Sequence, residues 1–113
     1  LMPERRTTPR KKFSYYMRVV DDDTQETLGH MVEVSEQGLQ LDTTAALPIN
    51  KDYYLRVELT PELADLPFIV FLARTKWCKI GNIPNLFHTG MQIIEILPED
   101  KDIFLSIVKK YSS

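Results

Sequence analysis

Alternation of apolar and polar side chains over residues 53–59 is the feature that most constrains the fold of this chain. The apolar positions are Tyr53, Leu55, Val57 and Leu59. Successive side chains of a β-strand point to opposite faces, so the pattern predicts a strand with one face in a core. The chain therefore has to build a sheet that buries that face.

Five further segments are expected to form strands, because aromatic and β-branched residues gather between turn-forming clusters. These segments are residues 13–20, 27–35, 39–43, 68–80 and 86–96. Residues 21–25 are a polar turn, Gly38 makes the next connection tight, and residues 81–85 form the turn of a long hairpin. Two prolines make residues 60–67 a loop.

The end of the chain changes from strand to helix pattern. Pro98 suits the first position of a helix, acidic residues follow it, and Lys109 and Lys110 fall in the last turn. One apolar face recurs at helical spacing and comprises Ile103, Phe104, Ile107, Val108 and Tyr111. The expected fold is all-β: a closed or nearly closed six-stranded antiparallel β-barrel whose open end or face is covered by a C-terminal α-helix.

Charge divides the chain into a basic N-terminal arm, residues 1–12, and a barrel domain, residues 13–113. The net charge is −2, but residues 1–18 carry six basic side chains against one acidic one, or +5, which leaves −7 for the rest. Such an arm suits the capture of an anion, and it also suits a solvated terminal segment. With little apolar area to bury, we expect the arm to be mobile without a ligand.

Composition excludes several classes of protein. With 113 residues, 43% of them hydrophobic, the chain has the size and composition of one ordinary domain, not of a disordered or fibrous chain. The longest apolar run, residues 66–73, is interrupted by Pro67 and is far shorter than the roughly 20 residues of a membrane span. A single cysteine and the lack of a signal-like start lead us to expect a cytoplasmic protein.

The sequence gives little support for a catalytic function. His30 and Ser35 lie five residues apart on one predicted strand and are expected to point to opposite faces, so they cannot form a nucleophile–base pair. His88 has no evident carboxylate to orient it. We therefore read both histidines as ordinary sheet residues and do not expect an enzyme.

The sequence gives equally little support for a metal site or a phosphate-binding loop. Cys78 stands alone beside Trp77, which favours packing over metal ligation or reactivity. Residues 21–23 resemble a calcium ligand run only in composition, because the glycine and the distal glutamate of an EF-hand loop are missing. No glycine-rich phosphate loop occurs among the four glycines. We expect no metal and no resident cofactor.

Two short motifs stand out together. The first is Arg6-Thr7-Thr8-Pro9-Arg10, preceded by Arg5, on the arm. The second is Glu33-Val34-Ser35-Glu36-Gln37-Gly38, which closes the second predicted strand. Over nearly its whole length the chain resembles the PilZ domain family, whose members carry R-x-x-x-R on an N-terminal arm and D/N-x-S-x-x-G in the following hairpin. The family folds as a six-stranded barrel followed by a helix, and its members are bacterial receptors for the second messenger cyclic di-GMP.

The resemblance implies a nucleotide site formed by Arg5, Arg6, Arg10, Glu33, Ser35 and Gly38. Arg6 and Arg10 match the arginine pair, and Ser35 and Gly38 match the second motif, whereas Glu33 stands where the family has Asp or Asn. Guanidinium groups suit phosphate oxygens and the guanine O6 and N7 edge, and Gly38 would allow a positive φ and close approach of the ligand. The extra methylene of Glu33 could misplace its acceptors at a cost of ~1–3 kcal/mol.

Three functions remain open at this point. The first is a cyclic di-GMP-binding effector or adaptor that orders its arm on the nucleotide and signals to a partner protein or a neighbouring domain. The alternative, suggested by Glu33, is a PilZ-like protein-interaction domain that has lost nucleotide binding. Nucleic-acid binding by the arm ranks lower, because the body is acidic and no aromatic residue interrupts the arm's basic residues before Phe13.

Overall fold

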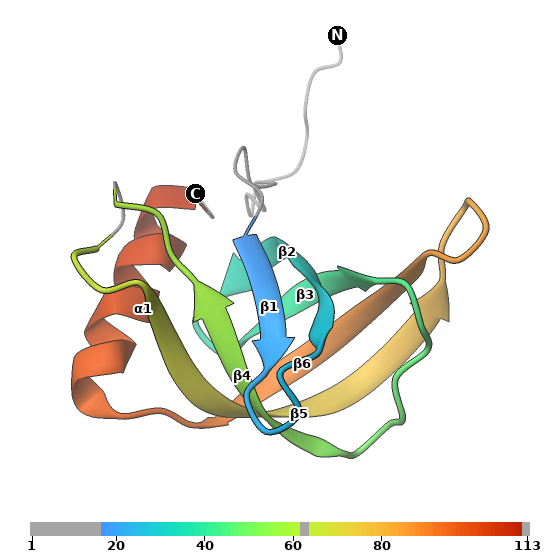
Figure 1. Cartoon of the computed structure of the whole chain (residues 1–113), viewed down its shortest axis with the longest axis horizontal. Coiled ribbons are helices and arrows are strands. Elements are labelled where there is room, and N and C mark those ends of the chain that lie inside the picture. The colour runs from blue at the N-terminus through green and yellow to red at the C-terminus, as the bar shows by residue number, and fades with distance from the viewer. Residues whose placement is uncertain (1–16, 62–63, 112–113) are drawn as a thin grey trace, which may run out of the picture.

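The computed structural model describes residues 17–61 and 64–111, which form a closed antiparallel barrel with one helix beside it (Figure 1). The elements are β1 (Met17–Asp21), β2 (Thr27–Ser35), β3 (Gly38–Thr43), β4 (Asp52–Glu58), β5 (Phe68–Ile80), β6 (Phe87–Glu95) and α1 (Pro98–Tyr111). The order around the barrel is β1-β2-β3-β6-β5-β4, and β4 pairs with β1 to close it. The predicted fold class is confirmed.

The strand boundaries lie close to those expected from the sequence. β2 and β5 have the predicted bounds, β3 begins one residue earlier, and β6 is one residue shorter at each end than the predicted segment. β1 begins at Met17, and residues 13–16 of the first predicted strand lie outside the described residues.

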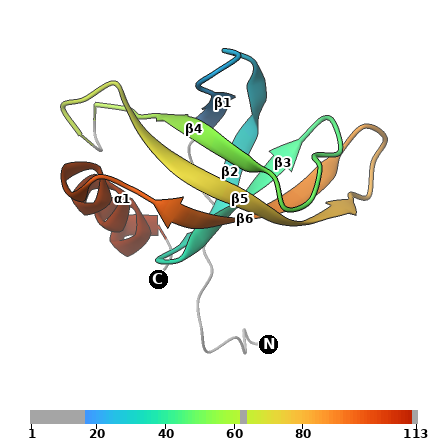
Figure 2. The same cartoon turned by 90° about the horizontal axis from the view of Figure 1, so that it is seen from below.

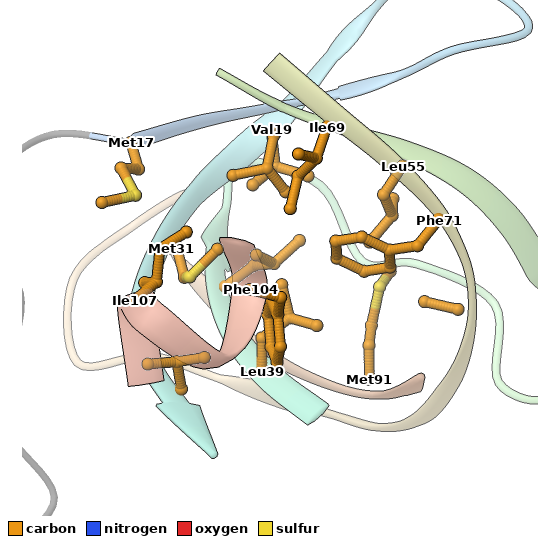
Figure 3. Close-up of a cluster of buried hydrophobic side chains, with 14 of the residues drawn as sticks. Met17, Val19, Met31, Leu39, Leu55, Ile69, Phe71, Met91, Phe104 and Ile107 are labelled. Carbon is orange, nitrogen blue, oxygen red and sulfur yellow. The ribbon is translucent and has the colours of Figure 1, made fainter. Parts of the chain in front are cut away.

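The interior of the barrel is filled by the alternating apolar residues. Tyr53, Leu55 and Val57 of β4 are buried, whereas Tyr54 between them is 48% exposed. Figure 3 shows side chains from the strands and from α1 converging on one cluster, among them Leu39, Met91 and Phe104. The period-two pattern therefore marks the inner face of the barrel, as expected.

Helix α1 covers one end of the barrel, and the β5–β6 hairpin projects at the other (Figures 1 and 2). Phe104 meets Phe71 edge to face, with ring centroids 5.6 Å apart, and Ile107 beside it is fully buried. Ile103 and Val108 complete the described part of the predicted apolar face, and the side chain of Tyr111 lies outside the described residues. No helix within residues 17–61 and 64–111 has the length and apolar character needed to cross a membrane.

The two predicted polar turns both close hairpins. The Asp21 carboxylate accepts hydrogen bonds from the backbone N–H groups of Asp23 and Thr24, so the acidic run serves the β1–β2 turn. In the β5–β6 hairpin, the Gly81 N–H donates to the Leu86 carbonyl at 2.7 Å, and Asn85 adopts the left-handed conformation with φ 61°. Asn tolerates that region better than most residues.

Candidate functional site

An open hollow of about 640 Å³ lies beside the β2–β3 turn. Its walls come from residues 33–40 of β2, the turn and β3, from Lys76 and Trp77 of β5, from residues 90–92 of β6, and from Val108 near the end of α1. Ligand pockets typically measure about 300–1,000 Å³, so the hollow has room for a nucleotide-sized molecule.

The second sequence motif forms the tip of the β2–β3 hairpin. Ser35 pairs with Gly38 across the turn, and the Ser35 hydroxyl lies 3.5 Å from the Gly38 carbonyl oxygen, at the outer limit of a hydrogen bond. The Gln37 carbonyl accepts a hydrogen bond of 2.9 Å from the Ile93 N–H, which ties the turn to β6. The structure thus brings Glu33, Ser35 and Gly38 together along one wall of the hollow.

A bulge in β2 corrects one expectation from the sequence. The register with β3 shifts between Met31 and Glu33, and Met31 and Val34 are both buried. The extra residue reverses the alternation, so His30 and Ser35 share the outer face instead of pointing to opposite faces. Five residues of strand still separate them by roughly 16 Å, so they form no nucleophile–base pair.

Gly38 corrects a second expectation. None of the described glycines has a positive φ, so Gly38 is not required for a left-handed turn. A Cβ at this position would collide with the carbonyl oxygen of Met91 and lie 3.2 Å from its carbonyl carbon. The glycine is needed because β6 passes directly against the end of the hairpin.

Trp77 was not among the site residues predicted from the sequence, and the structure places it in the lining of the hollow. It pairs with Gly90, which pairs in turn with Gln40, and Gln40 pairs with Glu33. These four residues therefore form one row across β5, β6, β3 and β2. Trp77 is 36% exposed, and the Lys79 ammonium lies 5.3 Å from the centroid of its ring, within the limit of about 6 Å for cation–π contacts.

The described lining of the hollow is not strongly basic. Glu33 and Glu36 bring negative charge and Lys76 brings positive charge. Arg74 lies two residues before Lys76 on β5, but its guanidinium donates to both Asp52 carboxylate oxygens, at 2.7 and 3.2 Å. These hydrogen bonds lower the pKa of Asp52 and raise that of Arg74, so the guanidinium is already paired. Lys76 is therefore the one basic residue among the described residues that line the hollow.

The three arginines predicted for the site, Arg5, Arg6 and Arg10, lie outside the described residues. The same holds for the expected mobility of residues 1–12. Of the six predicted site residues, the structure therefore places Glu33, Ser35 and Gly38.

One polar pair was missed in the sequence. Asp42 and His88 pair across β3 and β6, and His88 Nδ1 lies 2.7 Å from Asp42 Oδ1, so the expectation that no carboxylate orients His88 was wrong. The residues are 46 positions apart, and only the strand register, which the sequence pattern does not reveal, could have joined them. Within residues 17–61 and 64–111, no three metal-ligating side chains form a group that could hold a metal ion.

Comparisons with known proteins agree with this architecture. The model of the PilZ domain family matches residues 4–110. The PilZ domain of Escherichia coli YcgR, solved with c-di-GMP, superposes with a TM-score of 0.64 at 14% identity, over 96% of this chain and 92% of that one.

Two longer proteins contain a similar fold. The inhibitor of motility MotI (DgrA) of Bacillus subtilis gives a TM-score of 0.66 at 13% identity over 96% of this chain, and apo MrkH of K. pneumonia gives 0.68 at 15% over 98%. This chain spans about half of each, 52% and 53%. A comparison with curated protein sequences gives no significant match. Since the family model covers almost the whole chain, the protein belongs to the PilZ domain family.

Proposed function

We propose that this chain is a cyclic di-GMP-binding effector domain. The observation that carries the proposal is the hollow beside the β2–β3 turn, which has Glu33, Ser35 and Gly38 of the family's second motif on one wall. The similar PilZ domain of YcgR was solved with c-di-GMP, which supports the same class of ligand here.

The proposed division of labour follows from charge. The hollow offers carboxylates, amides and a hydroxyl, which suit the N–H groups of guanine, but Lys76 is its one cation among the described lining residues. Arg5, Arg6 and Arg10 would supply the guanidinium groups for the two phosphates and the guanine O6 and N7 edges. Binding would then hold the arm against the barrel and alter the surface that a partner protein or neighbouring domain meets.

The second candidate is a PilZ-like protein-interaction domain without nucleotide. It is favoured by Glu33, which stands where the family motif has Asp or Asn. The longer side chain moves its acceptors outward and has one more rotatable bond to immobilise. No catalytic role is proposed for either candidate.

Calorimetric titration of the chain with cyclic di-GMP, in parallel with Glu33→Asp, separates the two candidates. Saturable binding by the natural chain supports the effector function, and tighter binding by Glu33→Asp would mark Glu33 as a weakened version of the family contact. Binding by Glu33→Asp alone would establish a lapsed receptor and favour the interaction domain. Binding by neither variant, with both folded, would refute the nucleotide function for this chain.

A further inference from the structure

The tip of the β5–β6 hairpin holds two large apolar side chains in the open. Ile80 is 81% exposed, the largest exposed fraction of any large apolar side chain in the described residues, and Ile83 is 59% exposed. Ile80 pairs with Phe87 at the last position of the β5–β6 ladder, and Ile83 lies in the turn beyond it. The hairpin projects from the barrel at the end opposite α1, so both isoleucines lie away from the core (Figures 1 and 2).

The turn that carries these side chains is closed by its own contacts. The Gly81 N–H donates to the Leu86 carbonyl at 2.7 Å, and Asn85 turns the chain back with φ 61°. A Cβ on Gly81 would lie 2.8 Å from Leu86 Cγ, so the Leu86 side chain packs across the base of the turn. Leu86 is accordingly only partly exposed. The exposure of Ile80 and Ile83 therefore belongs to a folded hairpin.

Charge separates this hairpin from the rest of the barrel. Residues 66–94, which span β5 and all but the last residue of β6, contain Arg74, Lys76 and Lys79 and no aspartate or glutamate. Residues 17–65 carry eleven acidic side chains and three basic ones. Arg74 is paired with Asp52, but Lys76 and Lys79 form no ion pair with the carboxylates of the described residues. The hairpin is therefore the positive end of a negative barrel, and an anionic surface would attract this end first.

Single exposed apolar residues are common on protein surfaces, and the isoleucines alone would carry no function. In this hairpin, however, an apolar tip coincides with a segment that carries only positive charge. A stable protein interface covers about 800 Å² of each partner, which a narrow turn with two protruding side chains does not supply alone. A lipid surface can take up a small apolar projection, and anionic lipids attract the lysines beside it. The tip therefore suits a membrane surface better than a protein partner.

We propose that the β5–β6 hairpin makes a peripheral contact with an anionic membrane surface. Ile80 and Ile83 enter the layer of lipid headgroups, and the Lys79 ammonium lies at the lipid phosphates. Lys79 directly precedes Ile80, and its long apolar stem lets the charge stay at the surface while its neighbours sink deeper. The acidic residues elsewhere on the barrel keep its other faces away from the same surface. The contact needs no nucleotide, so it goes beyond the proposed function and does not depend on it.

Sedimentation with lipid vesicles measures this contact directly. The natural chain should bind vesicles of equal parts phosphatidylglycerol and phosphatidylcholine more tightly than vesicles of phosphatidylcholine alone. The double substitution of Ile80→Ser with Ile83→Ser should weaken binding about tenfold to a hundredfold, because both apolar side chains are lost from the headgroup layer. Lys79→Gln should weaken it about fivefold, as expected for one lysine at an anionic surface.

Leu97→Ser is the matched control. Leu97 is a large apolar side chain with 60% exposure, but it directly precedes α1, at the other end of the barrel (Figure 1), so its loss should leave vesicle binding unchanged. Every variant retains the basic arm, residues 1–12, so any attraction between the arm and the vesicles is common to all of them. Because the substituted side chains are exposed, all variants should melt near the natural chain. If the double variant does not fold, Lys79→Gln and Ile80→Ala decide the question.

Vesicle binding by the double isoleucine variant equal to that of the natural chain would overturn the proposal and leave the charge of the arm as the cause. Equal binding to both kinds of vesicle, or binding to neither, would overturn it as well. A dimer of the natural chain that the double variant abolishes, with vesicle binding unaffected, would assign the tip to a second copy of the chain. Neither isoleucine lines the hollow, so calorimetry with cyclic di-GMP tests the proposed function separately, and either proposal can fail without the other.

Discussion

Gly38 of β3 lies so close to Met91 of β6 that any side chain at position 38 would collide with the Met91 carbonyl oxygen. The carbonyl is backbone and is fixed by the pairing of β3 with β6, in which Leu39 faces Met91. It cannot turn aside as a flexible side chain could. The packing of β3 against β6 therefore requires the glycine of the family's second motif in this chain, whether or not a nucleotide binds.

Gly38→Ala should accordingly lose stability before any ligand is added. Forcing a methyl group into a packed site costs typically ~1–3 kcal/mol in free energy of unfolding, and urea denaturation would measure it. Ser35→Ala is the matched control from the same motif, because Ser35 is exposed and its hydroxyl makes only a long contact, so its stability should change by less than ~0.5 kcal/mol. A Gly38→Ala chain as stable as the natural one would contradict the packing argument.

Phe104→Ala should weaken the packing of α1 against the barrel and destabilise the fold. Phe104 is 1% exposed and meets Phe71 edge to face, so its truncation leaves a cavity where the helix covers the barrel. The expected loss is ~3–5 kcal/mol in the free energy of unfolding, measured by thermal or chemical denaturation. Ser106→Ala, on the exposed side of the same helix, should change it by less than ~0.5 kcal/mol. A small loss in Phe104→Ala would mean that the helix adds little to the fold.

Periodicity predicted the parts of the fold that depend on local pattern. β4 and α1 each bury one face at a regular spacing, and β5 is bounded by turn-forming residues at both ends. Their ranges could therefore be predicted from the sequence to within one residue. The motif that includes Ser35 could be located as well, because it is contiguous in the chain. These features need no knowledge of which strand pairs with which.

The remaining features of the site depend on strand register, which the sequence does not reveal. The bulge between Met31 and Glu33 changes which side chains share a face, and the contact between Asp42 and His88 exists only because β3 pairs with β6. The position of Trp77 over Gly90 likewise follows from the pairing of β5 with β6. In the sequence, only the glycine at position 90 pointed to this contact, and a glycine alone does not identify Trp77 as its partner.

The stability of the barrel should fall in acid partly through Glu58. Arg18 donates two hydrogen bonds to this carboxylate, at 3.0 and 2.8 Å, and they lower its pKa. A carboxyl whose pKa is lower in the folded state stabilises the fold above its unfolded pKa of about 4.3, and loses that contribution as pH falls through the folded value. Both side chains are partly exposed, so the contribution is at most ~1 kcal/mol.

Glu58→Gln tests this assignment by urea denaturation across pH. The natural chain should exceed Glu58→Gln in stability above pH 5, and the difference should shrink toward pH 3 as the carboxylate of the natural chain is protonated. Asp52, whose pKa Arg74 lowers, should add to the acid sensitivity of both proteins in the same direction. A difference that stays constant with pH would show that the variant acts through something other than the charge.

Removal of Arg10, the second arginine of the R-x-x-x-R motif, should weaken nucleotide binding more than removal of a neighbouring positive charge. Arg10→Ala takes away a guanidinium that the family motif assigns to the ligand, and losing a charge-assisted partner typically costs ~1.5–3 kcal/mol, about tenfold to a hundredfold in Kd. Arg10→Lys should restore little, because lysine keeps the charge but lacks the planar pair of donors. Calorimetry with cyclic di-GMP would give the three affinities.

Lys11→Gln provides the comparison for that experiment, because it removes one positive charge from the same arm outside the motif. If the arm acts only through its overall charge, affinity should depend only on the number of positive charges. Arg10→Lys should then bind like the natural chain, and Lys11→Gln and Arg10→Ala should both bind more weakly. All differences should then fade as salt screens the interaction, over a Debye length of about 10 Å at 0.1 M. If Arg10 makes a directed contact, the weakness of Arg10→Lys should persist at 0.3 M salt, where Lys11→Gln and the natural chain bind equally. Persistence of that gap would place the contribution of Arg10 in the geometry of its guanidinium and not in its charge.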